Sequence, residues 1–307
     1  MRWILSNRIK EVSQFCFGAM LLVILVLGCS NPKATKLNGL SLTSPGVTYH
    51  PRAFLPTLEN PGPTRQQVIE DLRLLRKIGF RSLVTYGADS TMGHIPGIAR
   101  QEGFDGLVIM GIWNPLSEQE WRNALAEAPF VDGYCLGNEG LGVRYSPDEL
   151  ASRMTELRRL TGHPVTTSEP IASYLGGPYR DWLLVNSDWL FPIAHPFLAG
   201  QGTTDSAVDW VVALYDYLTA TSKRQVIIKE TGFPSAGSKI CSEEIQLSFF
   251  RLLETKGIQF FYFEAFDQPW KKEIRQHEVE AHWGLFRADS TPKKVISWFA
   301  NRTLRSE

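Results

Sequence analysis

Two glutamates stand directly after short apolar segments in this chain of 307 residues. Glu139 follows the segment 133–136 and two polar or small residues, and Glu230 follows the segment 226–228 and one lysine. Two carboxyl groups held roughly 5 Å apart can cleave a glycosidic bond with retention, because one protonates the leaving oxygen while the other attacks the anomeric carbon. This chemistry requires a fold that brings the two side chains together.

Short apolar segments alternate with helix-periodic segments, which is the pattern of βα units in a parallel sheet. Strands are predicted at 46–49, 82–86, 107–112, 133–136, 165–167, 189–193, 226–228 and 260–263. Helices are predicted at 64–78, 118–127, 147–160, 179–184, 206–219, 242–256 and 293–304. A further short helix is predicted after the second strand and ends near residue 100. Eight such pairs indicate the α/β class and a single (β/α)₈ TIM barrel over residues 46–307. An open doubly wound sheet is less favoured, since no glycine-rich loop follows the first strand.

In such a barrel the reacting groups stand at the carboxyl ends of the strands, so polar side chains after predicted strands are candidates for the site. Besides the two glutamates these are Tyr86, Asp89, Trp113, Asn138, Glu169, His195, Glu264 and Asp267. A single glutamate among 32 acidic residues is usually a solvated surface group. The sequence around each candidate therefore has to distinguish a site from a surface.

The segments around the two glutamates resemble glycoside hydrolase family 17, the β-1,3-glucanases and β-1,3-glucanosyltransferases. They read YCLGNEG at 134–140 and KETGFPSAG at 229–237. Three more segments are similar to the family, TYGAD at 85–89, FEAFDQPWK at 263–271 and EAHWGLF at 280–286. The resemblance implies that Glu139 is the acid/base, that Glu230 is the nucleophile and that the substrate is a β-linked glucan. It implies no cofactor.

The resemblance and the chemistry together suggest roles for the neighbouring residues. We expect Asn138 to hydrogen-bond the sugar 2-hydroxyl and His195 to support the carboxylates. Glu264 and Asp267 are expected either to bind sugar hydroxyls or to support the two glutamates, and Glu280 either to bind the glucan or to pair with a loop lysine. Aromatic rings that could stack on sugar faces are Tyr49, Trp113, Phe233 and Trp270. Lys229 precedes the nucleophile in its strand, so we expect its side chain on the opposite face, without a catalytic role.

Two positions depart from the pattern of the family. Glu169 stands where relatives often have Ala-Asp followed by an aromatic residue. Phe233 replaces the commoner Trp, which keeps the ring and removes an indole N–H donor. These departures concern the details of sugar binding and leave the two glutamates unaffected.

The first 28 residues are predicted to be a lipoprotein signal peptide. Basic residues precede an apolar run at 15–27, which is too short to span a bilayer. Gly28-Cys29 follows this run directly. This end resembles a bacterial lipobox, although Leu27 is larger than the residue usual there, and it implies lipidation of Cys29. Residues 29–45 are then a flexible tether. The expected location is the cell envelope, lipid-anchored to a membrane and facing the periplasm or the exterior.

Charge and cysteine content exclude other classes of protein. The formal net charge is zero, so the basic footprint of a nucleic-acid binder is absent. No CxxC pair or His-x-x-x-His cluster occurs, and we expect no metal. Partners are then a β-glucan and the membrane, and the protein is expected to be a monomer. A glucanosyltransferase with the same residues remains open, and so does a non-catalytic glucan-binding lipoprotein.

Overall fold

A computed structural model describes residues 40–43, 46–56 and 62–303, with the side chains of 300–303 left out. The predicted signal peptide at 1–28, the lipidation site at Cys29 and most of the predicted tether lie outside the described residues. Within the described ranges, no helix combines the length and the apolar character needed to cross a bilayer.

The described residues form a parallel sheet of seven strands, which runs in the order β5-β4-β3-β2-β1-β7-β6. Neighbours pair in parallel register, for example Val47 with Leu83 and Ile109 with Gly133. The strands are β1 (Gly46–Thr48), β2 (Leu83–Val84), β3 (Val108–Ile112), β4 (Gly133–Asn138), β5 (Val165–Ser168), β6 (Ile228–Thr231) and β7 (Phe260–Tyr262). Each lies in or beside a predicted strand, so the α/β class and the parallel sheet are confirmed.

The sixth predicted strand, at 189–193, is not a regular strand. It forms isolated parallel bridges instead, from Ile193 to Pro170 after β5 and to Glu230 in β6. The Ile193 N–H donates to Glu169 O at 3.0 Å, and the Ala194 N–H donates to Glu230 O at 2.8 Å. Pro192 supplies no N–H to a ladder, which keeps this segment from pairing as a continuous strand. The segment therefore touches both edge strands of the sheet.

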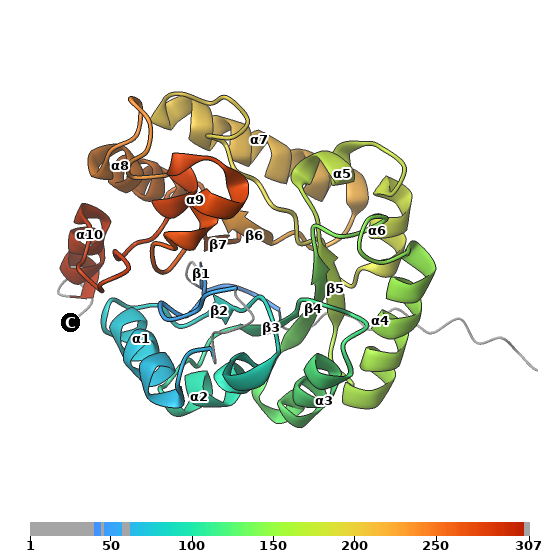
Figure 1. The fold of residues 1–307 in the computed structure, drawn as a ribbon. Coiled ribbons are helices and arrows are strands. Elements are labelled where there is room, and N and C mark those ends of the chain that lie inside the picture. The colour runs from blue at the N-terminus through green and yellow to red at the C-terminus, as the bar shows by residue number, and fades with distance from the viewer. Residues whose placement is uncertain (1–39, 44–45, 57–61, 304–307) are drawn as a thin grey trace, which may run out of the picture. The chain divides into compact units, whose positions relative to one another are not determined.

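Helices pack around the outside of the strands (Figure 1). The α-helices are α1 (Arg65–Lys77), α2 (Ile95–Gln101), α3 (Glu118–Ala126), α4 (Pro147–Thr161), α5 (Ile171–Leu175), α6 (Arg180–Asn186), α7 (Thr204–Ser222), α8 (Glu243–Glu254), α9 (Trp270–Arg275) and α10 (Lys294–Thr303). Three 3₁₀ turns are η1 (Ser90–His94), η2 (Ala128–Phe130) and η3 (Glu278–Ala281). The Ser146 side chain accepts from the Glu149 N–H in a capping box that starts α4, and Gly162 ends this helix at φ +73°. Helices α5 and α9 are short additions within loops.

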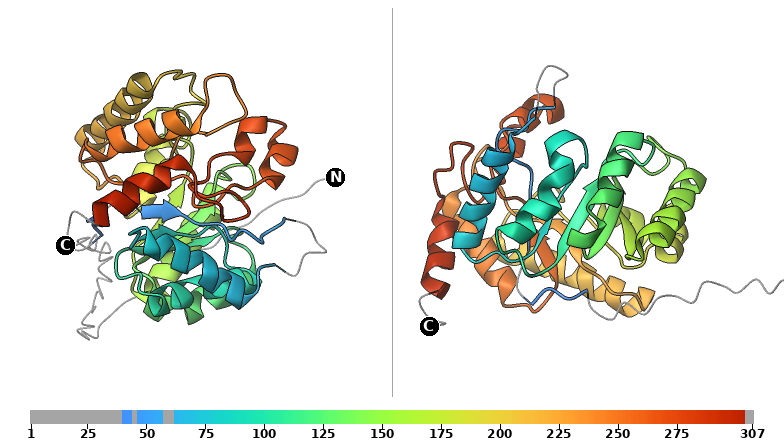
Figure 2. Two further views of the ribbon diagram at one scale, coloured as in Figure 1. Left: turned by 90° about the vertical axis from the view of Figure 1, so that its left-hand side faces the viewer. Right: turned by 90° about the horizontal axis from the view of Figure 1, so that it is seen from below.

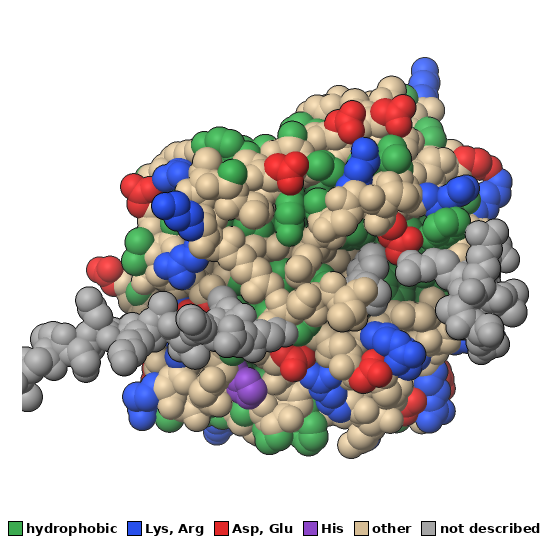
Figure 3. Space-filling view, turned by 180° about the vertical axis from the view of Figure 1, so that it is seen from behind, with side chains coloured by type: hydrophobic (Ala, Val, Ile, Leu, Met, Phe, Trp, Pro, Cys, Tyr) green, Lys and Arg blue, Asp and Glu red, His purple; other side chains and the backbone are tan. Residues whose placement is uncertain are grey.

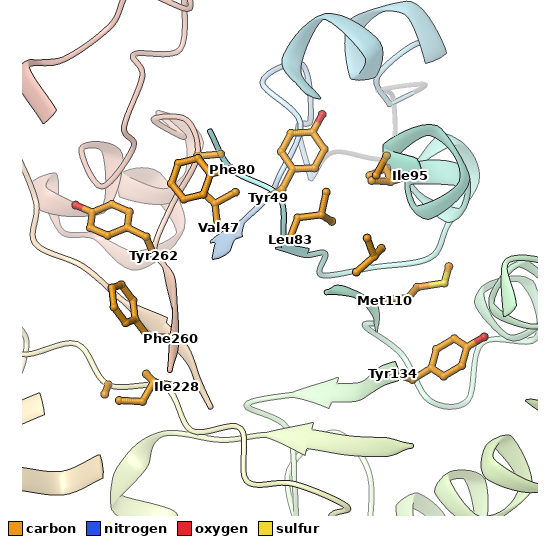
Figure 4. Close-up of a cluster of buried hydrophobic side chains, with 14 of the residues drawn as sticks. Val47, Tyr49, Phe80, Leu83, Ile95, Met110, Tyr134, Ile228, Phe260 and Tyr262 are labelled. Carbon is orange, nitrogen blue, oxygen red and sulfur yellow. The ribbon is translucent and has the colours of Figure 1, made fainter. Parts of the chain in front are cut away.

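Successive side chains of a strand point to opposite sides, and both faces of these strands are buried. Side chains on one face pack under the helices, as Figure 4 shows for Leu83, Met110, Tyr134 and Tyr262. Those on the other face form a second buried cluster in the middle of the strands, which contains Val84, Ile109, Cys135, Trp189, Phe191, Ile227 and Phe261. Cys135 is a buried free thiol within this second cluster.

Leu40 and Leu42 pack against the amino ends of the strands. Leu40 is buried in the cluster inside the strands, and its carbonyl oxygen accepts from the Gln225 side chain just ahead of β6. The Leu42 N–H donates to the Gln259 side chain just ahead of β7. The packed part of the chain therefore starts before Gly46, because these two leucines are apolar enough to join the core. Figure 3 shows the molecule from behind, with acidic and basic side chains interspersed rather than gathered by sign.

Candidate active site

A cleft of about 650 Å³ opens at the carboxyl ends of the strands. Glu139 and Glu230 both line it, although 91 residues separate them in the sequence. Glu139 is the first residue after β4, and Glu230 is the third residue of β6. The parallel sheet thus brings together the two carboxylates with which the sequence analysis began.

Glu230 is buried, with 4% of its surface exposed. Its Oε2 lies 3.5 Å from His195 Nε2, and its Oε1 lies 3.1 Å from Lys229 Nζ without the geometry of a hydrogen bond. Burial raises the pKa of Glu230, but Lys229 and His195 outweigh burial and bring it down to about 2. Glu230 is therefore ionised throughout the pH range in which a protein normally works.

The expectation for Lys229 was wrong. Its side chain is fully buried on the same side as Glu230, and its Nζ donates to Asn138 Oδ1. The ammonium also lies 4.6 Å from the centre of the Tyr86 ring. Register shifts between Ile228 and Thr231, and this irregularity of β6 lets two consecutive side chains reach one site.

Glu139 sits in a backbone conformation that non-glycine residues rarely adopt, with φ +50°. Its N–H donates to Ser168 O at 2.9 Å, which ties it to the end of β5. Glu169, which directly follows β5, accepts hydrogen bonds from the N–H groups of Gly140 and Leu141 at 3.0 Å each. Glu169 therefore fixes the loop that carries Glu139 and does not line the cleft.

An ion pair joins Glu139 to α9. Arg275 Nη2 lies 3.3 Å from Glu139 Oε2, and the Glu139 side chain is one-third exposed. No sequence motif marked Arg275. The pair is open to solvent, so its contribution to stability is small. It shows, however, that α9 reaches the edge of the cleft that carries Glu139.

Glu120 in α3 organises the opposite wall. Its carboxylate accepts from the N–H groups of Ala88, Trp113 and Asn114 at 2.7 to 3.0 Å. The Trp113 ring is 42% exposed and lines the cleft, with the Arg144 guanidinium 4.2 Å from its centre. Asp89 also lines this wall. Trp113 is therefore free to offer its other face to a ligand.

An aromatic cluster closes the side of the cleft between β1 and α9. The His50 ring stacks on Tyr86 at 4.5 Å and on Phe54 at 4.7 Å, and its edge meets Trp270 at 5.9 Å. Figure 2 shows α9 beside the segment that follows β1. Burial, followed by Lys271, lowers the pKa of His50 well below its ordinary value. His50 is therefore neutral, and an uncharged group of rings suits the apolar face of a sugar ring.

The remaining predicted cleft residues are in place. Asn138, His195, Trp270 and Glu280 line the cleft together with Tyr86 and Asp89. The His195 ring packs between Phe263 and Trp283 and turns Nε2 toward Glu230. Glu280 accepts from the Trp283 indole N–H at 3.2 Å. The position of His195 fits its expected supporting role, whereas Glu280 pairs with a tryptophan rather than with a loop lysine.

Three further predicted residues lie away from the cleft. Tyr49 is buried under α1, where its hydroxyl donates to Asp71 at 3.0 Å, and Phe233 is buried between Phe197 and Phe249. Side-chain alternation sends both rings toward the helices, so neither can stack on a sugar. Asp267 is paired with Lys293 at 2.6 Å beside a separate pocket of about 330 Å³.

Glu264 has an intermediate position. It is fully buried behind the cleft wall and paired at 2.6 Å with Lys271, which lines the cleft. Burial raises the pKa of Glu264 to about 7, against the opposing effect of Lys271. Of the alternatives that the sequence left open, support through a neighbour fits Glu264 and direct sugar binding does not. Lys271 itself was missed, although it ends a motif quoted above.

Comparison with known proteins identifies the family. Residues 46–284 match the BtgE/BtgC glycoside hydrolase domain, and the chain belongs to this family. One relative is a probable glucan endo-1,3-beta-glucosidase btgC from Aspergillus terreus, 25% identical over 78% of this chain and 43% of that protein. Another is a probable beta-glucosidase btgE from Aspergillus flavus, 28% identical over 80% of this chain and 42% of that protein. The chain spans less than half the length of these relatives.

Solved structures share the fold. An endo-laminarinase from Formosa Hel1_33_131 matches with a TM-score of 0.70 at 20% identity, over 85% of this chain and 87% of that one. A glycoside hydrolase family 17 β-1,3-glucanosyltransferase from Rhizomucor miehei matches with a TM-score of 0.66 at 24% identity, over 82% of this chain and 96% of that one. The family match thus confirms a glycoside hydrolase domain, and the solved structures, both below 25% identity, confirm the fold.

Proposed function

We propose that this chain is a retaining glycoside hydrolase that cleaves laminarin-type β-1,3-glucan through a covalent glycosyl-enzyme intermediate. The observation that carries the proposal is that Glu139 and Glu230 line one cleft in different surroundings. Glu230 is buried beside a lysine and a histidine, whereas Glu139 is partly exposed and within reach of solvent. The names of the curated relatives support a β-1,3-linked glucan as the substrate.

The two surroundings suit two roles. An ionised, buried carboxylate at Glu230 can attack the anomeric carbon, and a more exposed carboxyl at Glu139 can give its proton to the leaving oxygen. Glu139 then takes a proton from the water that hydrolyses the intermediate. Asn138 has its Oδ1 held by Lys229, which leaves its Nδ2 to donate to the sugar 2-hydroxyl.

The proposal is tested by expressing the chain from Asn31 onward and assaying laminarin, lichenan and cellulose side by side. We expect laminarin to be the preferred substrate, and activity on β-1,4 chains alone would refute the linkage. Glu230→Ala should abolish turnover, and azide should restore it with a glycosyl azide of inverted configuration. Glu139→Ala with azide should give the retained product. The opposite pattern would exchange the two roles.

Transfer to a second sugar is the other candidate, and Trp113 is the observation that favours it. Its exposed ring lines the same cleft as Glu139, and Arg144 supports its other face. Mass spectrometry at high laminari-oligosaccharide concentration should then detect products longer than the donor. Trp113→Ala should lower the ratio of transfer to hydrolysis. A ratio unchanged by this substitution removes the acceptor role of Trp113.

We also propose that the strands close into a (β/α)₈ barrel and that a lipid on Cys29 anchors the chain in the cell envelope. The hydrogen bonds of the segment 188–194 to the ends of β5 and β6 support the closure. The anchor rests on the sequence at Gly28-Cys29. Mass spectrometry of the N-terminal peptide should find a fatty acylated Cys29, and Cys29→Ala should release the protein from membranes. An unmodified Cys29 in the membrane fraction would refute the anchor.

A further inference from the structure

Lys229 is buried where an ammonium group is costly. Only 1% of its side chain is exposed, and burying an unpaired ammonium costs several kcal/mol. Its charge is compensated by Glu230 Oε1 at 3.1 Å and by a hydrogen bond to Asn138 Oδ1. The Tyr86 ring adds a cation–π contact at 4.6 Å. Three different strand ends therefore fix this cation against the carboxylate.

The other groups facing Glu230 do not replace Lys229. His195 lies 3.5 Å from Oε2, on the other side of the carboxylate. Tyr86, His50 and Glu264, in the segments that follow β2, β1 and β7, and Cys135 in β4 interact electrostatically with Glu230. The Lys271 ammonium is 2.6 Å from Glu264 and is compensated there. Lys229 is thus the cation closest to Glu230 among the described residues.

We propose that Lys229 is a positioning residue of the reaction: it keeps Glu230 ionised in acid and makes Glu230 a good departing group when the covalent intermediate breaks down. The inference rests on the proposed retaining hydrolysis. Asn138 and Tyr86 stop the long side chain from swinging away, so the cation stays in place through both steps. Burial alone would favour the neutral form of Glu230, and Lys229 opposes it.

The two chemical steps differ in what they do to this pair. In the first, Glu230 forms a bond to the anomeric carbon, the glycosidic C–O bond breaks, and the proton of Glu139 goes to the leaving oxygen. The carboxylate charge is lost to the ester, and the Lys229 ammonium keeps only neutral polar partners, Asn138 and an ester oxygen of Glu230. In the second, water attacks the anomeric carbon, its proton passes to Glu139, and the C–O bond to Glu230 breaks. Glu230 regains its charge beside Lys229, so the cation favours breakdown of the intermediate over its formation.

The test compares Lys229→Met and Lys229→Arg with wild type through the pH dependence of kcat/KM on laminarin, each normalised to its own plateau. With the pKa of Glu230 near 2 in the wild type, its profile should stay flat to about pH 3. In Lys229→Met the acid limb should move to 4.5 or above, the ordinary value for a glutamate. At pH 3.5 this variant should retain about a tenth of its plateau. Lys229→Arg should restore the wild-type limb.

Lys293→Met is the matched control. Lys293 is another buried lysine paired with a carboxylate, Asp267, but it lies outside the cleft. This control should lower the melting temperature and leave the acid limb unchanged, once thermal unfolding shows that it is folded at the assay temperature. A purely structural effect of losing a buried lysine would instead move both limbs alike.

Two further measurements distinguish failure of the inference from failure of the proposed function. With a nitrophenyl β-laminari-oligosaccharide, wild type should show no burst of nitrophenol, whereas Lys229→Met should show one because its intermediate accumulates. A 2-deoxy-2-fluoro glycoside should label Glu230 of the wild type at a rate that stays flat down to about pH 3. No label and no laminarin turnover would overturn the proposed function, and the inference with it. Two other results overturn the inference and leave the proposed function standing. In the first, Glu230 of the wild type is labelled but the acid limb of its pH profile lies near 4.5. In the second, the acid limb of Lys229→Met equals that of the wild type.

Discussion

Removal of the Glu169 carboxylate should impair Glu139, the proposed acid/base, while leaving Glu230, the proposed nucleophile, intact. Glu169 lies at the end of β5 with 7% of its surface exposed. Its Oε1 accepts two backbone hydrogen bonds of 3.0 Å, from the two residues that directly follow Glu139. Glu169→Ala leaves both N–H groups without this partner, beside a residue that already holds an uncommon backbone conformation.

The size of the effect follows from those two bonds. A hydrogen bond to a charged acceptor contributes about 1.5–3 kcal/mol, and the buried Glu169 itself has a desolvation cost that its removal recovers. We therefore expect the free energy of unfolding to fall by about 2–4 kcal/mol. A displacement of Glu139 by about 1 Å lowers kcat/KM by about 100-fold. Glu169→Gln keeps an acceptor oxygen and should lose much less.

The assay compares laminarin with a dinitrophenyl β-glycoside, whose leaving group needs no proton. Glu169→Ala should lose activity on laminarin and keep most of its activity on the dinitrophenyl substrate. Glu120→Ala is the control, because Glu120 likewise accepts three backbone N–H groups but holds the loops at Ala88 and Trp113. It should lose stability and show no dependence on the leaving group. Equal losses of Glu169→Ala on both substrates would refute the positioning role.

Three further predictions concern stability and pH. Gln246→Leu removes a buried amide that donates to the carbonyl groups of Phe233, Trp283 and Gly284, so urea unfolding should show a loss of about 2–4 kcal/mol. Phe233→Ala should lower the free energy of unfolding by about 3–5 kcal/mol in the same assay, because the ring is buried in the core. Its KM for laminarin should be unchanged, and a raised KM would show that the ring contacts the substrate after all. The pKa of Glu230 is depressed from 4.5 to about 2, so its contribution to stability is present above pH 4.5 and is lost as pH falls toward 2. Wild type should therefore lose stability over this range more steeply than Glu230→Gln, and equal slopes would contradict the depressed value.

The sequence was sufficient for the features that depend on local pattern. Helix boundaries such as those of α4 follow from Ser146, Glu149 and Gly162, which are visible as capping signals. The two glutamates were found because each stands at a strand end within a longer motif. Both kinds of signal lie within a few residues of the feature that they predict.

The errors arose where the direction of a side chain decides its role. Tyr49 ends a predicted strand and Phe233 lies in a quoted motif, but both rings are buried in the core under the helices. Lys229 was assigned to the wrong face because a regular strand was assumed, and β6 is irregular there. Arg275 approaches Glu139 from α9 across 136 positions of sequence, and no local pattern encodes such a contact.

The leucines packed at the amino ends of the strands bear on how the protein would meet a polymer. Leu40 and Leu42 lie at one pole of the strands, and the cleft opens at the other. If a lipid on Cys29 anchors the protein, as proposed, the attached chain enters the packed domain at the end of the strands that is remote from the cleft. A glucan could then enter the cleft without passing the point at which the chain joins the domain.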